Sequence, residues 1–468
     1  MGGELDMKNF LRFLVLTISI LIVSVPVFAS DLLTTSYDTM LIKENYDNYF
    51  GYDTSIANVL DLNSIKVQTN GKFINFTDSN GNKVEPQIIN DRTMVPMRKI
   101  FEEFGAEVDW IPETRSIIAK TAEKEIGLQI DNVNAVVKNI NGEIKNISLD
   151  SVPVIVDDRT LVPVRFVAES LDKIVGWDIE NKAVVIVDPE FIEEEIKEKA
   201  STFYEYLTTD FETVTTSVTQ SDITGKIKYE DKDTNISSTL NITGDAQISL
   251  AGTAVKMDLD LNVTGKGVLI TTVKEEGLEK IDATIIIDAE NGFMYISSNL
   301  LGEDMDGKWA RYEFKDSDKK LLQSSLTQNN GMEGLVDSLV NEEGLVLGSY
   351  EELKNTINII TSLMGNDNFK SSGRTTKTYK IEIDLEKILE AFGYTEEEIK
   401  EIDDVYDFEM TSEIKVADKV AKKSNTTLDF KMDYEDEALD VNLVIDSSLE
   451  SYNEKVNIEM PTNYIVAE

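Results

Sequence analysis

The chain has 468 residues and contains neither cysteine nor histidine. The lack of cysteine excludes disulfides, thiol nucleophiles and thiolate ligands for metal ions. The lack of histidine excludes an imidazole base, His-dependent catalytic triads and imidazole-bound copper or zinc. Basic residues are also scarce, because 45 Lys and Arg face 87 Asp and Glu, which gives a net charge of −42. This field repels nucleic acid and anionic lipid headgroups, so we expect no nucleic-acid partner.

The first segment has the pattern of a secretory signal peptide. Lys8 and Arg12 precede an apolar run at residues 13–23. Small residues then occupy the positions usual before a cleavage point, the last of them Ala29. We predict cleavage after Ala29 and a secreted protein, extracellular or associated with the cell wall. An uncleaved anchor is the alternative, although the run is short for a bilayer span. No later stretch is long and apolar enough to cross a membrane, so we expect no stable membrane span after cleavage.

An internal repeat follows a polar linker or N-terminal arm at residues 30–62. The run DRTMVPMR, which begins at Asp91, returns 67 residues later as DRTLVPVR, which begins at Asp158. In the same register, Trp110 falls on Trp177. Such a repeat indicates one supersecondary unit used twice, here within residues 63–188.

Each repeat predicts the order strand, helix, strand, strand. The opening strands are expected at residues 65–67 and 152–156, and the start of each motif run has the composition of a turn. Pro96 and Pro163 suit the first position of a helix, where no backbone donor is needed. The expected helix faces are Met97, Ile100, Phe101 and Phe104, then Val164, Val167, Ala168 and Leu171; the expected strands are 106–110 and 116–121, then 175–179 and 183–187.

Residues 63–188 resemble the copper amine oxidase N-terminal-like domain, a stalk module of many secreted bacterial proteins, in both motif runs and both tryptophans. The resemblance implies a surface or spacer module. In the amine oxidases, histidine ligands bind copper in a separate catalytic domain. This chain has no histidine, so we predict no amine oxidase activity and no enzyme.

We interpret the motif residues as structural, with Asp in turns and Arg in local ion pairs such as Arg98–Glu102 and Arg165–Glu169. A binding site formed by the same residues is the alternative. The residues concerned are Asp91, Arg92, Thr93, Pro96, Arg98 and Trp110, with their counterparts Asp158, Arg159, Thr160, Pro163, Arg165 and Trp177.

A second domain is predicted at residues 189–468. Asp188 and Pro189 suit the cap and first position of its opening helix. Apolar and polar residues then alternate over 255–263 and over several other segments, which indicates an antiparallel sheet with one buried face. A hairpin is expected at 281–296 through Asn291-Gly292, and helices are expected around 335–340, 353–360, 385–392 and after a capping box at Thr395–Glu398. The predicted fold class is α+β, a small duplicated domain followed by a curved half-barrel sheet with helices on one side.

The element order of residues 190–465 resembles the lipoprotein-carrier superfamily of bacterial envelopes, whose half-barrels hold acyl chains or other apolar ligands. The resemblance implies an apolar ligand in the second domain. An ordinary packed core without a cavity is the alternative, because a hollow interior and a filled one need the same apolar face.

Residues 302–313 match part of a calcium loop. Asp304, Asp306 and Glu313 occupy acidic positions of such a loop, but Gly302 stands where an aspartate is expected. A plain acidic turn is the alternative reading of this segment. We expect no bound metal and no cofactor.

The function expected from these observations is that of a secreted, non-enzymatic cell-envelope protein. Its expected partners are a lipid or other apolar molecule and cell-wall or other envelope components. A surface structural or adhesion protein without a ligand cavity is the main rival, and an acid-catalysed hydrolase is a third reading. A large apolar cavity would favour the carrier, a filled core with exposed aromatic residues would favour adhesion, and two carboxylates converging in a cleft would favour the hydrolase.

Overall fold

The described residues form two compact units, each of which is treated by itself below. Residues 65–195 and 340–357 form the first, called the motif unit, and residues 196–338 and 358–466 form the second, called the sheet unit. The signal peptide and the segment 30–62 lie outside the described residues. The computed structural model describes residues 65–77, 84–178, 181–301, 308–315, 319, 331–338, 340–341, 344–345 and 349–466.

The motif unit contains two sets of elements whose bounds differ by 67 residues throughout, in the order strand, strand, helix, strand and strand. One strand was predicted before each helix, whereas two strands form a hairpin there. The first set is β3 (Gln87–Ile89), β4 (Arg92–Pro96), α5 (Met97–Glu103), β5 (Glu107–Ile111) and β6 (Ser116–Lys120). The second set is β10 (Val154–Val156), β11 (Arg159–Pro163), α6 (Val164–Ser170), β12 (Ile174–Asp178) and β13 (Ala183–Val187).

The first residue of each motif run lies in a two-residue hairpin turn. Asn90 and Asp91 have φ of 51° and 59°, and Asp157 and Asp158 have φ of 48° and 57°. Two consecutive positive φ values in a two-residue hairpin are typical of a type I′ turn, which Asn and Asp tolerate. The turn is shorter than predicted, because the arginine and threonine that follow already belong to β4 and β11.

The prolines of the motif end a strand rather than open a helix. Pro96 closes β4 and is the N-cap of α5, and Pro163 does the same for β11 and α6. The predicted first helical position was therefore wrong by one residue. The cap position also suits proline. Its ring allows the extended backbone of a cap residue, and the missing N–H is not needed there.

Strands β4 and β11 pair with each other in a register that is symmetric about Val95 and Val162. Val95 lies opposite Val162, Pro96 opposite Leu161, and Met94 opposite Pro163. Because each residue of one motif faces the other motif in the mirrored order, a local two-fold axis passes between the two valines. The four-stranded sheet has the order β10-β11-β4-β3.

Beyond that sheet, the two halves of the motif unit differ. β13 pairs in parallel with β1 (Lys66–Thr69), which itself pairs with β2 (Lys72–Phe73). The prediction that the strand at residues 65–67 opens the first repeat was therefore wrong, because β1 pairs with the last strand of the second repeat. β6 instead continues into an antiparallel meander that was not predicted, through β7 (Lys124–Gln129), β8 (Asn134–Asn139) and β9 (Ile144–Ser148). The predicted apolar faces of α5 and α6 are buried in the core of this unit.

The helix after β13 begins as predicted but is interrupted. The Asp188 carboxylate accepts a hydrogen bond from the backbone N–H of Glu190, which caps α7 (Pro189–Lys199). A break at Ala200, with φ of −137°, separates α7 from α8 (Ser201–Leu207). The apolar residues Ile192, Ile196, Phe203 and Leu207 are all buried.

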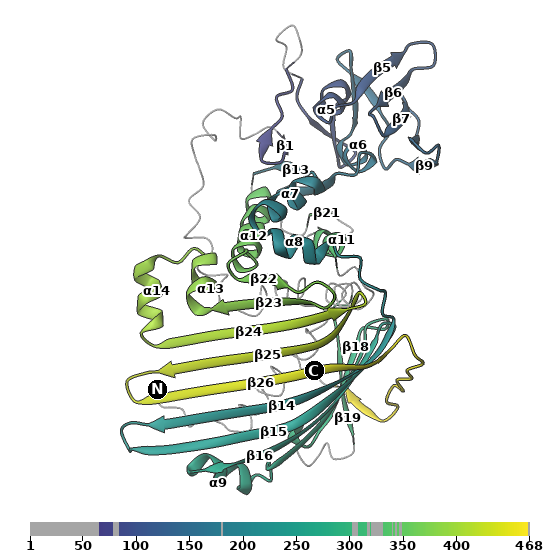
Figure 1. The fold of residues 1–468 in the computed structure, drawn as a ribbon. Helices are drawn as coiled ribbons and strands as arrows, with labels where there is room; N and C mark the ends of the chain where they lie inside the picture. The colour runs from purple at the N-terminus through teal and green to yellow at the C-terminus, as the bar shows by residue number, and fades with distance from the viewer. Residues whose placement is uncertain are drawn as a thin grey trace. The chain divides into compact units, whose positions relative to one another are not determined.

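The sheet unit is built on one twelve-stranded sheet that curves into a half-barrel (Figure 1). All neighbouring strands are antiparallel except β19 and β27, which are parallel. In spatial order the strands are β22 (Phe369–Ser372), β23 (Lys377–Asp384), β24 (Tyr406–Ala417), β25 (Val420–Asp433), β26 (Glu437–Tyr452), β14 (Thr216–Asp231), β15 (Ile236–Ala251), β16 (Ala254–Lys266), β17 (Lys280–Asp288), β18 (Phe293–Ser298), β19 (Trp309–Glu313) and β27 (Tyr464–Val466).

The alternation read from the sequence gives this sheet two different faces. Val255, Met257, Leu259, Leu261 and Val263 are all buried on one face of β16, which confirms the prediction. We call this the inner face and the opposite one the outer face. On the outer face a row of carboxylates crosses five neighbouring strands in register, through Asp446, Asp222, Asp245, Asp260 and Asp282.

Helices of the C-terminal half mostly follow the predictions. The predicted face of α12 (Tyr350–Leu363) is buried, Gly393 with φ of 84° follows α13 (Leu385–Ala391), and a capping box starts α14 (Glu396–Asp403). One prediction was wrong, because α11 (Met332–Ser338) ends before Val340, which lies in β20 (Val340–Asn341) paired with β21 (Gly344–Leu345). The unpredicted helix α9 (Val268–Glu275) follows β16, and a short turn of helix, Asn299–Leu301, follows β18.

Candidate functional site

The motif residues take part in backbone geometry and in local pairs. Asp91 and Asp158 occupy the type I′ turns, and the prolines cap the helices. Arg98 lies 3.8 Å from Glu102 and also donates to the Val108 carbonyl over 3.3 Å.

The second motif has the matching pair. Arg165 lies 4.0 Å from Glu169. Burial raises the pKa of Glu169 above its ordinary value, against the opposing effect of the Arg165 charge. Arg92 also forms an ion pair with Asp150. Its counterpart in the second motif, Arg159, occupies the same position at the start of its strand.

The two tryptophans of the repeat have different surroundings. Trp110 packs against the core of the motif unit, whereas Trp177 is 40% exposed. Thr93 and Thr160 are half-buried in β4 and β11. The motif residues therefore hold turns, caps and helix surfaces, and the contacts described above do not gather them around one point.

Of the candidate calcium residues, Asp304 and Asp306 lie outside the described residues. Glu313 is exposed at the end of strand β19, opposite Phe293 of β18. Across the described part of the chain, no group of three or more acidic side chains is placed to hold a metal ion. Nor is any helix there long and apolar enough to span a membrane.

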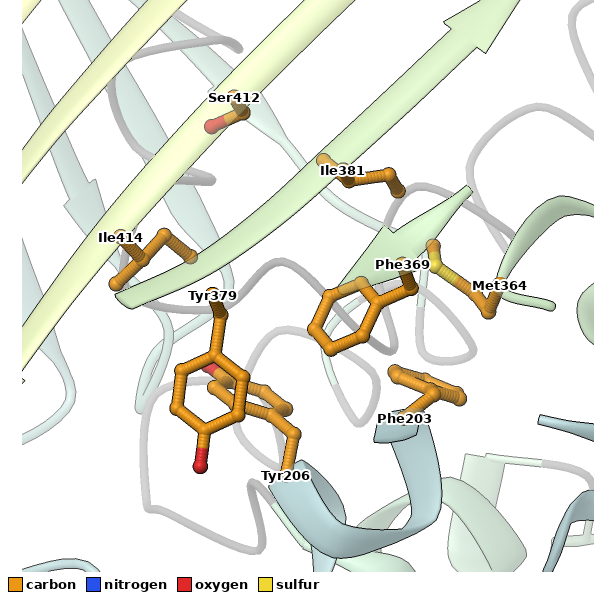
Figure 2. Close-up of a pocket in the computed structure, with 8 residues that line it drawn as sticks. All are labelled: Phe203, Tyr206, Met364, Phe369, Tyr379, Ile381, Ser412 and Ile414. Carbon is orange, nitrogen blue, oxygen red and sulfur yellow. The ribbon is translucent and has the colours of Figure 1, made fainter. Parts of the chain in front are cut away.

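Side chains of α8, of strands β22, β23 and β24 and of Met364 line a small pocket (Figure 2). Its free volume is about 10 Å³, which is the space of about one water molecule. Aromatic rings fill the rest: Tyr206 lies edge-on to Tyr379, with ring centroids 4.9 Å apart, and Phe203 lies edge-on to Phe369 at 5.6 Å. Burial raises the pKa of Tyr206 to about 12, so its hydroxyl stays neutral. The lining residues are Phe203, Tyr206, Met364, Phe369, Tyr379, Ile381, Ser412 and Ile414.

A group of hydroxyl side chains lies at inner-face positions next to this pocket. We call Ser221, Ser412, Ser424, Thr426 and Ser447 the hydroxyl cluster; each is at most 6% exposed. Ser412 and Thr426 are paired across β24 and β25 with their hydroxyl oxygens 2.9 Å apart, and Ser221 and Ser447 are paired across β14 and β26 at 2.8 Å. Ser424 lies opposite Ser447 in the sheet register, and its hydroxyl has no hydrogen-bond partner.

Towards the end of the strands where the β14–β15 and β25–β26 hairpins turn, the inner face is less well covered. Residues of β26 farther from the turns, such as Leu443 and Ile445, are at most 3% exposed. Five residues nearer the turns are only half-buried, and we call them the inner strip: Phe408, Phe430, Met432, Leu439 and Val441. They are neighbours in the register of β24, β25 and β26.

Exposed apolar residues lie at the same end of the sheet as the inner strip. Tyr406 lies opposite Met432 in the register, and its ring centroid is 6.5 Å from that of Phe430. With it we define the rim patch, which also includes the loop before α14, two hairpin ends and the start of α9. Its members are Ile236, Val268, Tyr394, Tyr406 and Tyr434, and they are between 39% and 57% exposed.

The sequence predictions missed the hydroxyl cluster. They also missed that inner-face residues become less buried towards the hairpin turns. The signal for the cluster was present, since Ser and Thr stand at apolar positions of strictly alternating strands, as in Ser412 between Met410 and Ile414. What the alternation does not contain is the register, which brings hydroxyls from four strands together.

The comparisons with known proteins concern the two halves separately. Residues 69–186 match the family model of the copper amine oxidase N-terminal domain, which confirms the resemblance read from the motifs. That match is to the non-catalytic N-terminal domain alone. No curated protein matches the chain.

Among solved structures, a beta-barrel-like protein of the domain of unknown function DUF1849 from Brucella abortus aligns with 52% of this chain and 100% of its own. The identity is 10% and the TM-score is 0.19. OccK11 (OpdR) and OccK8 (OprE) of Pseudomonas aeruginosa align at 5% and 8% identity over 76% and 71% of this chain, covering 76% and 78% of their own, each with a TM-score of 0.11. Because these TM-scores are low, the architecture of the sheet is established by its own strand pairing and not by these structures.

Proposed function

We propose that the sheet unit binds an apolar ligand on its inner face, with the inner strip as the contact surface and the rim patch as the entrance. The observation that supports this most directly is the approach of the half-buried ring of Phe430 to the exposed ring of Tyr406, with ring centroids 6.5 Å apart. Scattered apolar residues on a surface need no explanation, but a contiguous group marks a site of contact. The pocket beside α8 has space for only about one water molecule, so the ligand would lie on the strip.

The free energy available from such contact is sufficient for binding. Removing apolar surface from water contributes about 25 cal/mol per Å², or roughly 1.5–3 kcal/mol for complete burial of one large side chain. The five residues of the inner strip are already half-buried, so each would contribute less than that. Together they would offset the several kcal/mol that association costs.

The test is a titration of the purified protein with Nile red, a neutral apolar fluorophore. Phe430→Ala removes the ring at the centre of the strip, and we expect its affinity to fall about 10-fold, since 1.4 kcal/mol corresponds to a factor of ten. Thr427→Ala is the control, because Thr427 lies on the same strand but on the outer face. Equal affinities for the wild type and Phe430→Ala, or no uptake by either, would contradict the proposal.

We further propose that the protein is a secreted, non-enzymatic component of the cell envelope. The N-terminal pattern ending at Ala29 supports export, and the absence of histidine together with the match to a stalk domain supports a module without catalysis. The 67-residue offset and the symmetric β4–β11 register support a duplicated unit. N-terminal sequencing of the protein from the culture medium and the cell wall would test export, with serine 30 as the expected first residue; an intact N-terminus would contradict it.

A surface structural or adhesion role is the second candidate. The filled pocket and the exposed rings of Tyr394, Tyr406 and Tyr434 favour it, because aromatic side chains supply large contact area to a protein or carbohydrate partner. Retention on purified cell walls separates the two readings. Retention that is lost on replacing the three tyrosines by serine, without any uptake of Nile red, would support adhesion over ligand binding.

A further inference from the structure

The meander of the motif unit ends in an edge strand, β9, whose outer side is open. It is the last strand of the five-stranded sheet, beside β8. The backbone N–H of Leu149 donates to the Val133 carbonyl over 2.7 Å, and bonded and unbonded pairs alternate along an antiparallel ladder. The N–H and C=O groups of Ile144, Asn146 and Ser148 therefore point away from β8. Within the described residues no hydrogen bond reaches these groups, so they are available to a further strand.

Other edges of this unit carry features that discourage pairing, and β9 does not. Proteins protect edges with proline, with charge or with very short strands. Pro86 and Pro153 directly precede β3 and β10, which have three residues each, and β5 carries Glu107 and Asp109. β9 has five residues with no proline and no carboxylate, in a chain where 87 of 468 residues are acidic.

We propose that β9 pairs antiparallel with β9 of a second copy, which gives a symmetric dimer centred on Asn146. Only this centre supplies all three outward-pointing residues of each strand with a bonded partner. Asn146 then lies opposite its own counterpart, and Ile144 lies opposite Ser148 of the second copy. The one charged side chain, Lys145, faces Ile147 and not another lysine. The two five-stranded sheets become one continuous sheet.

A second copy fits this edge better than an unrelated peptide for two reasons. A two-fold contact needs a self-complementary strand, and the register about Asn146 brings no like charges opposite each other. The net charge of −42 opposes the approach of two copies, so contact is expected where carboxylates are absent. The β8–β9 hairpin also gathers exposed apolar residues, which mark a contact surface. They are Val133, Val136, Ile140 and Ile144, between 38% and 81% exposed.

Single cysteines test the register directly, because the chain contains no cysteine of its own. In the proposed dimer the two copies of Asn146→Cys form a bonded pair with Cα atoms about 5.5 Å apart, within the range of roughly 4.4–6.8 Å for a disulfide. Ser148→Cys is the matched control on the same strand, because its two copies are offset by about 13 Å along the strands. Under mild oxidation of the mature protein, we expect a covalent dimer for Asn146→Cys and monomers for Ser148→Cys on a non-reducing gel.

Sedimentation velocity of the mature protein tests the backbone pairing without a cross-link. We expect the wild type to dimerise reversibly below about 1 mM, and more strongly as salt screens the repulsion between copies. Asn146→Pro removes the N–H that donates across the two-fold axis, and we expect at least about 10-fold weaker dimerisation. This N–H has no partner within one copy, so the fold should persist, as circular dichroism would verify. Asn146→Thr keeps the N–H and should dimerise like the wild type.

The outcomes do not depend on ligand binding by the sheet unit. A wild type that stays monomeric up to about 1 mM overturns the proposal. So does a dimer whose strength Asn146→Pro leaves unchanged, or equal cross-linking of Asn146→Cys and Ser148→Cys. If Asn146→Pro does not fold, the two cysteine variants decide the question.

Discussion

Paired hydroxyls in a buried sheet depend on each other. Replacing Ser221 by alanine leaves the hydroxyl of Ser447 without its partner at 2.8 Å, in surroundings that exclude water. We expect Ser221→Ala to lower the free energy of unfolding by about 1–3 kcal/mol. Urea denaturation followed by circular dichroism in the far ultraviolet measures this, since the twelve-stranded sheet dominates the signal.

Ser424→Ala serves as the internal comparison for this prediction. It removes a hydroxyl of similar burial that has no partner, so its stability should equal that of the wild type or exceed it. If Ser221→Ala and Ser424→Ala changed the unfolding free energy equally, the pairing would have no energetic meaning. Sequence alone could not have ranked these two serines, because their difference lies in which neighbour the register supplies.

At the scale of strands, the outer face carries an unfavourable row of like charges. Asp245 of β15 lies directly between Asp222 of β14 and Asp260 of β16. Like charges directly opposite each other in a sheet are destabilising, by roughly 0.2–1 kcal/mol per pair. We expect Asp245→Asn to raise the free energy of unfolding by about this amount, measured in urea at neutral pH and low salt.

A different aspartate provides the control for this charge effect. Asp440 of β26 lies between Lys228 of β14 and Lys431 of β25 in the register, so Asp440→Asn relieves no repulsion and should give no gain. The gain in unfolding free energy from Asp245→Asn should also shrink in about 0.5 M salt, because the screening length is short there. A gain that is independent of salt would point to packing or propensity and not to repulsion.

Elements were predictable from the sequence where a period repeats several times. The strict alternation of residues 255–263 located β16 and its buried face, and the capping box at Thr395 located α14. Shorter signals were ambiguous. Val340 fitted a helical spacing but lies in a two-residue strand, and the apolar residues of β7 and β8 were not recognised as strands although they alternate. The parallel pairing of β1 with β13 joins residues more than a hundred positions apart, so no local pattern contains it.

At the scale of the whole protein, the sequence predicted a half-barrel but not how far its inner face is filled. Alternating apolar residues of the same kind line the small pocket around Tyr379 and form the half-buried inner strip around Phe430. Which of them are covered depends on where α8 and the loops pack, and this follows from tertiary contacts alone. The candidate site could therefore be assigned to a domain from the sequence, but not to residues.

The net charge of −42 acts on the whole protein at once. Many lysines of the sheet already pair with carboxylates, as Lys280 does with Asp260 and Asp282 at 3.1 Å. The carboxylates that remain unpaired repel one another. Added salt weakens these exposed pairs only slightly, because each contributes about 1 kcal/mol or less, while it screens repulsion across the entire surface. We expect the melting temperature to rise by about 2–4 °C, equivalent to roughly 1 kcal/mol, as sodium chloride is raised from about 0.02 to 0.3 M. Potassium chloride at equal ionic strength should give the same rise, and a fall in melting temperature with either salt would mean that the ion pairs outweigh the repulsion.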